Sequence, residues 1–264
     1  MRKSNDKVPE KNLARDAAPC SLILGDCLEM MKQIPDGSVN MVLCDLPYGT
    51  TACKWDTVIP FEPLWAQYRR IAKPNAAIVL TAAQPFTSVL GASNISDLRY
   101  AWVWEKENAT GHLNAKRMPM KLTEDVLVFY REPPTYNPQG VIACSKNTRR
   151  GGNGDNYGKS GVENLQTAEN YPRNVLRFPR DPGKVHPTQK PVALMEYLIR
   201  TYTNEGETVL DNTMGSGTTG VACMNTGRNF IGIERDEEYF RVASERISSA
   251  NVRPLAPADT QTPQ

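Results

Sequence analysis

The stretch Asn40-Met41-Val42-Leu43-Cys44-Asp45-Leu46-Pro47-Tyr48-Gly49 joins a buried strand to a sharp polar turn. Its apolar run, 41–44, is long enough for a strand and too short for a helix. The turn places an anionic acceptor, Asp45, next to the backbone carbonyl of Leu46 and the flat face of Tyr48, and Pro47 stiffens it without offering an N–H. Two acceptors beside a stacking surface suit a planar ring with an exocyclic amine, although a capping aspartate in an ordinary strand-ending turn would look the same.

Outward from this stretch, short apolar runs alternate with amphipathic segments. The pattern predicts strands at 21–24, 41–44, 76–81, 100–104, 126–130, 207–210 and 229–233. The predicted helices include 27–34, 61–73 and 85–91, one that begins at Pro191, one that is closed near Gly227 and one that Asp236 caps. Strands that alternate with helices indicate an α/β fold with a mostly parallel sheet.

Composition is that of an ordinary globular protein. The chain has 264 residues, of which 40% are hydrophobic and 23% charged, and a net charge of +2, so any affinity for nucleic acid must come from a local patch. No apolar run approaches the roughly 20 residues of a membrane helix. Six cysteines without a C-x-x-C pair and only two histidines predict no metal site and fit a reducing cytoplasm. We expect residues 1–19 to be a disordered leader and 251–264 a disordered tail.

A glycine-rich turn, Gly215-x-Gly217-x-x-Gly220, follows a predicted strand, and Glu234 comes about 20 residues later. This spacing formally matches a dinucleotide fingerprint, so a nicotinamide oxidoreductase stays an alternative. However, Asp211 at the strand end would repel a pyrophosphate and attract a cation. S-adenosylmethionine has an ammonium, a sulfonium and an adenosine but no phosphate, and Glu234 can accept its ribose hydroxyls. Asp26 adds a third carboxylate at a strand end, on the edge where open α/β sheets bind ligands.

The region 131–182 shows no regular pattern and is rich in Pro, Gly and Asn. A structureless loop this long inside a compact domain is usually functional or disordered. Its middle is basic, because Asp155 is the one acid among four cations. These cations are Lys146, Arg149, Arg150 and Lys159.

These motifs, in this order, resemble the β group of DNA amino-methyltransferases, which act on adenine N6 or cytosine N4. The segment 45–48 matches the catalytic D-P-P-Y-type motif, with Leu46 where proline is common, and 211–219 matches the cofactor motif. The resemblance implies the S-adenosylmethionine-dependent methyltransferase fold: a seven-stranded, mostly parallel sheet with helices on both faces and a circularly permuted motif order. It also implies one catalytic domain, 20–250, with 131–182 as its target-recognition region.

The resemblance assigns roles residue by residue. Catalysis falls to Asp45, Leu46, Pro47 and Tyr48. The residues expected to bind S-adenosylmethionine are Asp26, His186, Thr188, Lys190, Asp211, Thr213, Gly215, Ser216, Gly217, Thr218 and Glu234. Those expected to contact DNA are Lys54, Trp55, Lys146, Arg149, Arg150 and Lys159.

The implied reaction is methyl transfer to adenine N6 in duplex DNA after base flipping. Asp45 favours adenine, because N4-cytosine enzymes of this group often carry serine there. N4-cytosine transfer stays an alternative, as do methylation of RNA or of a protein amide and a non-catalytic role in DNA binding. A homodimer and a cognate restriction nuclease are left open as partners.

Overall fold

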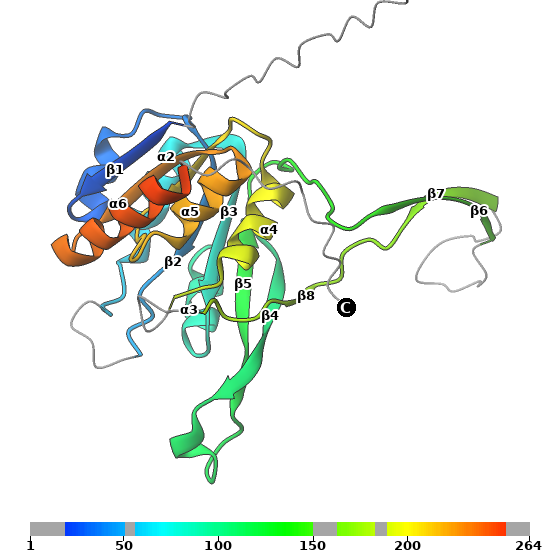
Figure 1. The fold of residues 1–264 in the computed structure, drawn as a ribbon, viewed down its shortest axis with the longest axis horizontal. Coiled ribbons are helices and arrows are strands. Elements are labelled where there is room, and N and C mark those ends of the chain that lie inside the picture. Colours follow the sequence, from blue (N-terminus) through cyan, green and yellow to red (C-terminus); the bar gives the residue numbers. More distant parts are fainter. Residues whose placement is uncertain (1–18, 51–55, 150–162, 183–188, 252–264) are drawn as a thin grey trace, which may run out of the picture.

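Strand β2 (Val39–Asp45) lies near the middle of the main sheet. The structure is a computed structural model, and it describes residues 19–50, 56–149, 163–182 and 189–251. The other strands of this sheet are β1 (Cys20–Leu24), β3 (Ala72–Ala82), β4 (Leu98–Thr110), β5 (Lys121–Phe129), β8 (Val175–Arg177), β9 (Thr208–Asp211) and β10 (Asn229–Glu234). Their spatial order is β1-β10-β9-β2-β3-β5-β4-β8 (Figure 1). A separate antiparallel pair, β6 (Ile142–Arg149) and β7 (Glu163–Glu169), forms an arm that projects from the body.

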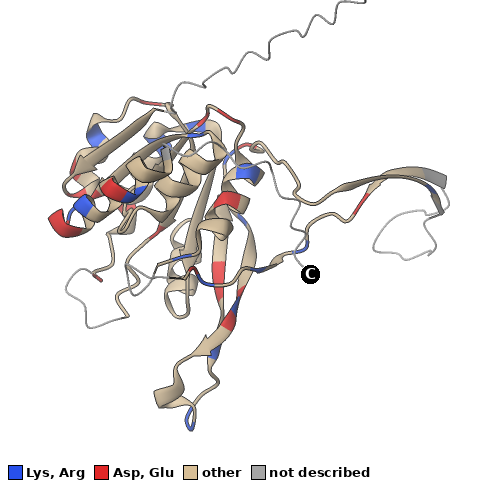
Figure 2. Ribbon diagram, viewed as in Figure 1, with Lys and Arg blue, Asp and Glu red and all other residues tan. Residues whose placement is uncertain are grey.

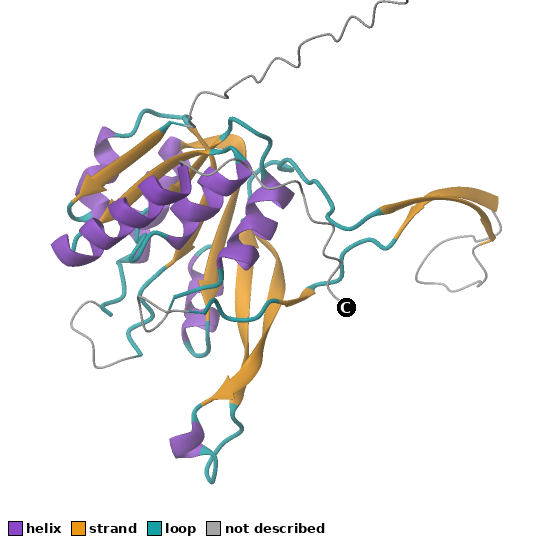
Figure 3. Ribbon diagram, viewed as in Figure 1, coloured by secondary structure: helices purple, strands orange, loops and turns teal. Residues whose placement is uncertain are grey.

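Helices cover both faces of the sheet (Figure 3). They are α1 (Cys27–Met30), α2 (Phe61–Ile71), α3 (Phe86–Ser93), α4 (Val192–Tyr202), α5 (Thr218–Thr226) and α6 (Glu237–Asn251), with short 3-10 turns at Met31–Gln33 and His112–Asn114. Strand β2 shows why two layers form. Met41 and Leu43 join the core under α4, α5 and α6, whereas Val42 and Cys44 join the core under α1, α2 and α3. A strand that is buried on both faces has no polar side, which explains its unbroken apolar run.

Strand direction brings the predicted site residues to one edge. The five strands β1, β10, β9, β2 and β3 are parallel, and β5 is antiparallel to both β3 and β4. Asp45, Asp211 and Glu234 are the last residues of β2, β9 and β10, and Asp26 follows β1. Because the carboxyl ends of parallel strands meet at the same edge, four carboxylates distant in sequence converge there.

The predicted α/β fold with a mostly parallel sheet is confirmed, with local differences. An eighth strand, β8, adds to the expected seven by pairing with β4. The arm β6–β7 and strand β8 lie in the region expected to be irregular, because the arm sequences are largely polar and β8 has only three residues. Helix α1 ends earlier than predicted, at Met30, and Pro191 caps α4 instead of beginning it.

The predicted leader and tail lie outside the described residues except at their inner ends, 19 and 251. Within the described ranges, no helix is both long and apolar enough to cross a membrane.

Helix α5 packs so closely on its neighbours that Gly220 has no room for a side chain. A Cβ there would lie 2.4 Å from Cδ1 of Ile247 in α6 and 2.7 Å from Cε1 of Phe230 in β10. We therefore expect Gly220→Ala to lower the free energy of unfolding by about 1–3 kcal/mol through overpacking. Chemical denaturation measures this change.

Gly91→Ala in α3 is the matched control, since its Cβ would be in ordinary contact, 3.5 Å from Leu98. Alanine is the better helix former, so this variant should be neutral or gain up to about 1 kcal/mol. Equal losses in the two variants would contradict the packing described for α5.

Candidate active site

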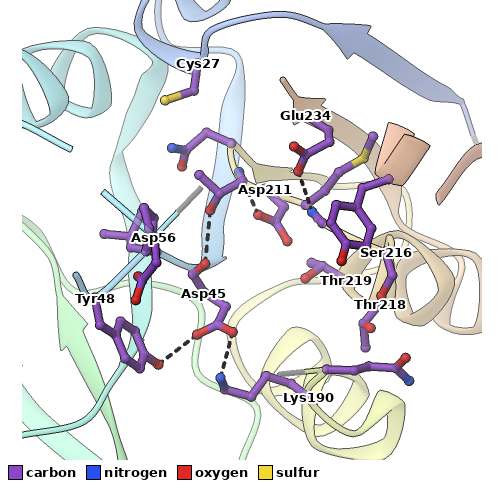
Figure 4. Close-up of a pocket in the computed structure, with 18 of the residues that line it drawn as sticks. Cys27, Asp45, Tyr48, Asp56, Lys190, Asp211, Ser216, Thr218, Thr219 and Glu234 are labelled. Atoms are coloured by element: carbon purple, nitrogen blue, oxygen red, sulfur yellow. Dashed lines mark hydrogen bonds and ion pairs between the residues drawn. The ribbon is translucent and has the colours of Figure 1, made fainter. Parts of the chain in front are cut away.

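A cavity of about 400 Å³ opens at the carboxyl edge of the sheet. Four segments supply most of its wall: the turns after β1, β2, β9 and β10, with β4 and β5 adding a further side. Figure 4 shows Glu234 on one side of Asp211 and Asp45 on the other. The lining includes Asp26, Asp45, Leu46, Pro47, Tyr48, Lys106, Glu124, Lys190, Asp211, Asn212, Thr213, Gly215, Ser216, Thr218 and Glu234. Both predicted ligand sites thus face one continuous space.

The glycine turn between β9 and α5 shapes one wall of this cavity. Gly215 and Gly217 both have positive φ angles, +49° and +80°, which a glycine adopts without a steric penalty. The Gly215 N–H donates to Oε2 of Glu234 at 2.9 Å. Gly217, unlike Ser216 and Thr218, does not line the cavity. A Cβ on it would meet Cβ of Ala243 at 2.9 Å, so its glycine is needed for packing against α6.

Asp211 is a buried carboxylate, only 3% exposed, at the centre of the cavity. It accepts the N–H of Thr213 at 3.1 Å, and no salt bridge of the described residues includes it. Burial raises the pKa of Asp211 to about 7, although a hydrogen bond from Thr219 opposes the shift. A carboxylate in this state is stabilised by a cationic ligand.

The neighbouring Asn212 contributes an unused donor. Its Oδ1 accepts the hydroxyl of Tyr68 at 2.6 Å and the thiol of Cys44 at 2.9 Å, which fixes the amide. Its Nδ2 is buried and has no hydrogen-bond partner in the described part of the chain. Since a buried unpaired donor is costly, it suits a ligand that brings an acceptor.

Backbone contacts hold the two outer carboxylates of the cofactor side in place. Oε1 of Glu234 accepts the N–H groups of Arg235 and Asp236, both at 2.9 Å. Oδ1 of Asp26 caps α1 by accepting the N–H of Leu28 at 2.9 Å. Each carboxylate keeps further lone pairs that can face the cavity.

Asp45 is held on three sides. Its Oδ1 accepts the hydroxyl of Tyr48 at 2.7 Å and also that of Thr81, at the end of the neighbouring strand β3. Its Oδ2 accepts Nζ of Lys190 at 2.6 Å. A carboxylate offers about four acceptor positions, so about one remains for a ligand.

Lys190 is the second member of a chain of alternating charges. Its Nζ also lies 3.3 Å from Oε2 of Glu124, and Oε1 of Glu124 lies 3.1 Å from Nζ of Lys106. Burial alone would lower the pKa of Lys190, but the attraction of the Asp45 and Glu124 carboxylates raises it well above its ordinary value. The sequence predicted that Lys190 contacts the cofactor, whereas the structure places its ammonium on the predicted catalytic aspartate.

One face of the Tyr48 ring is already covered. It stacks on Phe86 with ring centroids 5.1 Å apart and an interplanar angle of 22°. Burial, followed by the charge of Asp45, raises the pKa of Tyr48 well above its ordinary value, so its hydroxyl stays protonated as a donor. A base that stacks on Tyr48, as predicted, must therefore use the opposite face.

The other predicted site residues are either outside the described part of the chain or away from the cavity. Six of them lie outside the described residues: Lys54, Trp55, Arg150, Lys159, His186 and Thr188. Only the backbone of Arg149 is described, in β6. Lys146 forms an exposed ion pair with Glu169 across the arm and does not line the cavity.

Sequence reasoning missed the partners of Asp45 and of its turn. Thr81 had a weak signal, because it is the polar residue that ends a predicted strand. Asp56 accepts the N–H groups of Gly49 and Thr50 at 2.8 and 2.9 Å and thereby closes the turn after β2. Lys106 and Glu124 had no signal, since only the pairing of β4 with β5 brings them together.

Comparison with known protein families identifies the family of this chain. The family described as DNA methylase, of the N6/N4 type, matches residues 39–245. The chain belongs to this family. The resemblance inferred from the motifs is therefore confirmed.

Individual relatives are moderately similar to this methylase. DNA adenine methyltransferase YhdJ of Escherichia coli (strain K12) is 29% identical over 250 residues, covering 88% of this chain and 83% of the relative. Type II methyltransferase M.HpaI of Haemophilus parainfluenzae is 29% identical over 245 residues, covering 86% and 74%. The structure of the M1.HpyAVI–SAM complex is 28% identical, with a TM-score of 0.61, covering 86% of this chain and 99% of the other.

The raised pKa of Asp211 should make the stability of the ligand-free methylase depend on pH. Between about pH 4 and pH 7 the folded state binds more protons than the unfolded state, so this group lowers stability as pH rises. Asp211→Asn cannot ionise. We expect its free energy of unfolding, relative to the native chain, to increase from pH 5 to pH 8 by up to about 3 kcal/mol, because about two pH units of the shift lie in this window.

Urea unfolding at the two pH values measures this difference. The exposed Asp36→Asn, which breaks only a surface ion pair with Arg70, serves as the control. A difference between Asp211→Asn and the native chain that does not change with pH would contradict the assigned pKa.

Proposed function

We propose that this DNA methyltransferase transfers a methyl group to N6 of adenine in double-stranded DNA, after the base has been flipped out of the helix. The observation that supports the proposal most directly is the environment of Asp45. This residue is a partly buried carboxylate with about one open acceptor position, next to the Leu46 carbonyl on the cavity wall. An adenine-specific name for the relative YhdJ supports the choice of base.

The methyl donor is S-adenosylmethionine, and the residues of the acidic side fit it. Among the described residues, Asp211 has no cationic partner and Nδ2 of Asn212 has no acceptor, and the donor carries both an ammonium and a carboxylate. Glu234 and Asp26 would hold its ribose and adenine side. When bound, it supplies an electrophilic methyl carbon, whose bond to sulfur breaks with both electrons remaining on sulfur as the amine nitrogen bonds to the carbon.

The Asp45 turn prepares the amine for attack. The N6 lone pair is delocalised into the adenine ring, so the free amine is a weak nucleophile. Asp45 Oδ2 accepts one N–H and the Leu46 carbonyl accepts the other, which draws the nitrogen towards tetrahedral geometry and frees its lone pair. After the new bond forms, the nitrogen loses one proton to Asp45 and from there to water. Positioning and electrostatics thus supply most of the catalysis.

Tyr48 supports the flipped base. Flipping a base out of the duplex costs a few kcal/mol, and stacking of the base on an aromatic ring offsets about 1–3 kcal/mol of this free energy. Because Phe86 backs the ring of Tyr48, the ring is held ready before the base arrives. The predicted target-recognition region, 131–182, would contact the flanking duplex, with Lys146 among its phosphate contacts once the pair with Glu169 opens.

N4 of cytosine is the second candidate, because the family includes both N6 and N4 enzymes. Its exocyclic amine presents the same two N–H groups to Asp45 and Leu46. Methylated duplex DNA can be digested to nucleosides and analysed by mass spectrometry. N6-methyladenine is expected, and N4-methylcytosine in its place would overturn the assignment.

Asp45→Ala tests the catalytic assignment directly. Loss of the acceptor should reduce methyl transfer to duplex DNA to about a hundredth to a thousandth of the native rate, or less. Binding of S-adenosylmethionine, measured by calorimetry, should change little because Asp211 and Glu234 are untouched. Glu245→Ala, which removes an exposed carboxylate on α6, is the control. An active Asp45→Ala enzyme would mean that the catalytic centre lies elsewhere.

A further inference from the structure

Glu124 is a carboxylate that the proposed reaction does not use, although it lines the cavity. It lies on β5, and Oε1 is engaged by Lys106 from the neighbouring strand β4. Oε2 is buried and accepts no hydrogen bond from the described residues. Nζ of Lys190 is 3.3 Å away, and a charge-assisted hydrogen bond needs only about 0.5 Å less. Glu124 is therefore an unfilled acceptor for a cation that is already beside it.

The arriving amine creates a need for such an acceptor. Lys190 already donates to Oδ2 of Asp45 at 2.6 Å, so the amine N–H has to share this oxygen with an ammonium. The amine nitrogen also becomes positive as it is methylated, and an ammonium held on Asp45 would oppose that charge. Moving the Lys190 ammonium into a buried site without a counter-ion would be strongly unfavourable.

We propose that Glu124 is the alternative counter-ion of Lys190: as the target amine engages Asp45, the Lys190 ammonium shifts from Asp45 to Glu124. The inference rests on the proposed function. Lys190 stays paired throughout, and the four charges of Lys106, Glu124, Lys190 and Asp45 sum to zero before and after the shift. Glu124 acts through Lys190, which makes it a positioning residue.

Glu124→Gln tests the shift because it keeps the shape and removes the charge. Lys190 then stays on Asp45, and the single-turnover rate of methyl transfer should fall about ten- to hundredfold. The dissociation constants for S-adenosylmethionine and duplex DNA should stay near those of the native enzyme. Glu124→Asp, which restores the charge, should recover part of the rate. Glu105→Gln, which removes a carboxylate that pairs with Arg177, is the matched control.

Two outcomes decide the inference. If Glu124→Gln folds poorly because Lys106 is left unpaired, the double variant Lys106→Met/Glu124→Gln removes both charges and should still transfer slowly. A native single-turnover rate in either variant would overturn the shift while leaving methyl transfer by the native enzyme intact. A native chain that transfers no methyl group to DNA would instead refute the proposed function.

A second observation concerns the hairpin formed by β4 and β5. Thr81 and Ala82, the last residues of β3, pair with Val126 and Asp125, so the preceding part of β5 extends past the carboxyl edge of the sheet. The hairpin thus projects on the side where the cavity opens, and its stem contributes Lys106, Thr110 and Glu124 to the lining. Its tip, 111–122, is exposed throughout.

The tip carries charge of one sign. Lys116, Arg117 and Lys121 lie within 108–122, which contains no acidic residue, and Figure 2 shows this positive end. Leu113 is fully exposed beside them. A projecting β-ribbon with cations and an apolar residue suits a nucleic-acid groove. We infer that this tip contacts duplex DNA next to the flipped base, an inference that also rests on the proposed function.

Lys116→Ala/Arg117→Ala should weaken duplex binding regardless of sequence and reduce the slope of log K against log salt by about 2. Fluorescence anisotropy with a labelled duplex at several salt concentrations measures both. The control is Lys73→Ala/Arg99→Ala, which removes two cations near the starts of β3 and β4, at the opposite edge. Equal binding by the two double variants would overturn the contact, whereas a native chain without any affinity for duplex DNA would refute the proposed function as well.

Discussion

The ion pair between Asp45 and Lys190 is the contact on which the site depends. It joins residues 145 positions apart, one at the end of β2 and the other just before α4. Lys190 is almost fully buried, and a buried ammonium without a counter-ion would be strongly unfavourable. Asp45 therefore holds the segment that leads into α4, while Lys190, Tyr48 and Thr81 fix the orientation of the carboxylate.

The two sides of the cavity differ in their charge. On the cofactor side, three carboxylates, Asp26, Asp211 and Glu234, outnumber the arginines that line the cavity there, and no salt bridge among the described residues includes Asp211. On the side of Asp45, the charges of Asp45, Lys190, Glu124 and Lys106 alternate in sign and sum to zero. A cationic methyl donor is thus drawn to the first side, whereas a neutral, planar amine suits the second. The glycine turn lies against both, since Thr213 Oγ1 donates to the Asp45 carbonyl at 3.2 Å.

The sequence predicted the site residues that lie at the ends of strands. Asp45, Asp211 and Glu234 each follow an apolar run, so a parallel sheet necessarily gathers them at one edge. Glu124 and Lys106 were missed because their role depends on the pairing of two antiparallel strands and on their extension past β3. For Lys190, the motif indicated a place near the cofactor but could not show which carboxylate its long side chain reaches. The arm β6–β7 was missed because exposed polar strands show no hydrophobic period.

The central claim is that Asp45 and the Leu46 carbonyl receive the two N–H groups of the target amine. A crystal structure with duplex DNA and an unreactive analogue of S-adenosylmethionine tests it most directly. We predict a flipped adenine with N6 within hydrogen-bond distance of Oδ2 of Asp45 and of the Leu46 oxygen, and the ammonium of the analogue near Asp211. A target amine directed away from Asp45, with the analogue bound as predicted, would contradict this account.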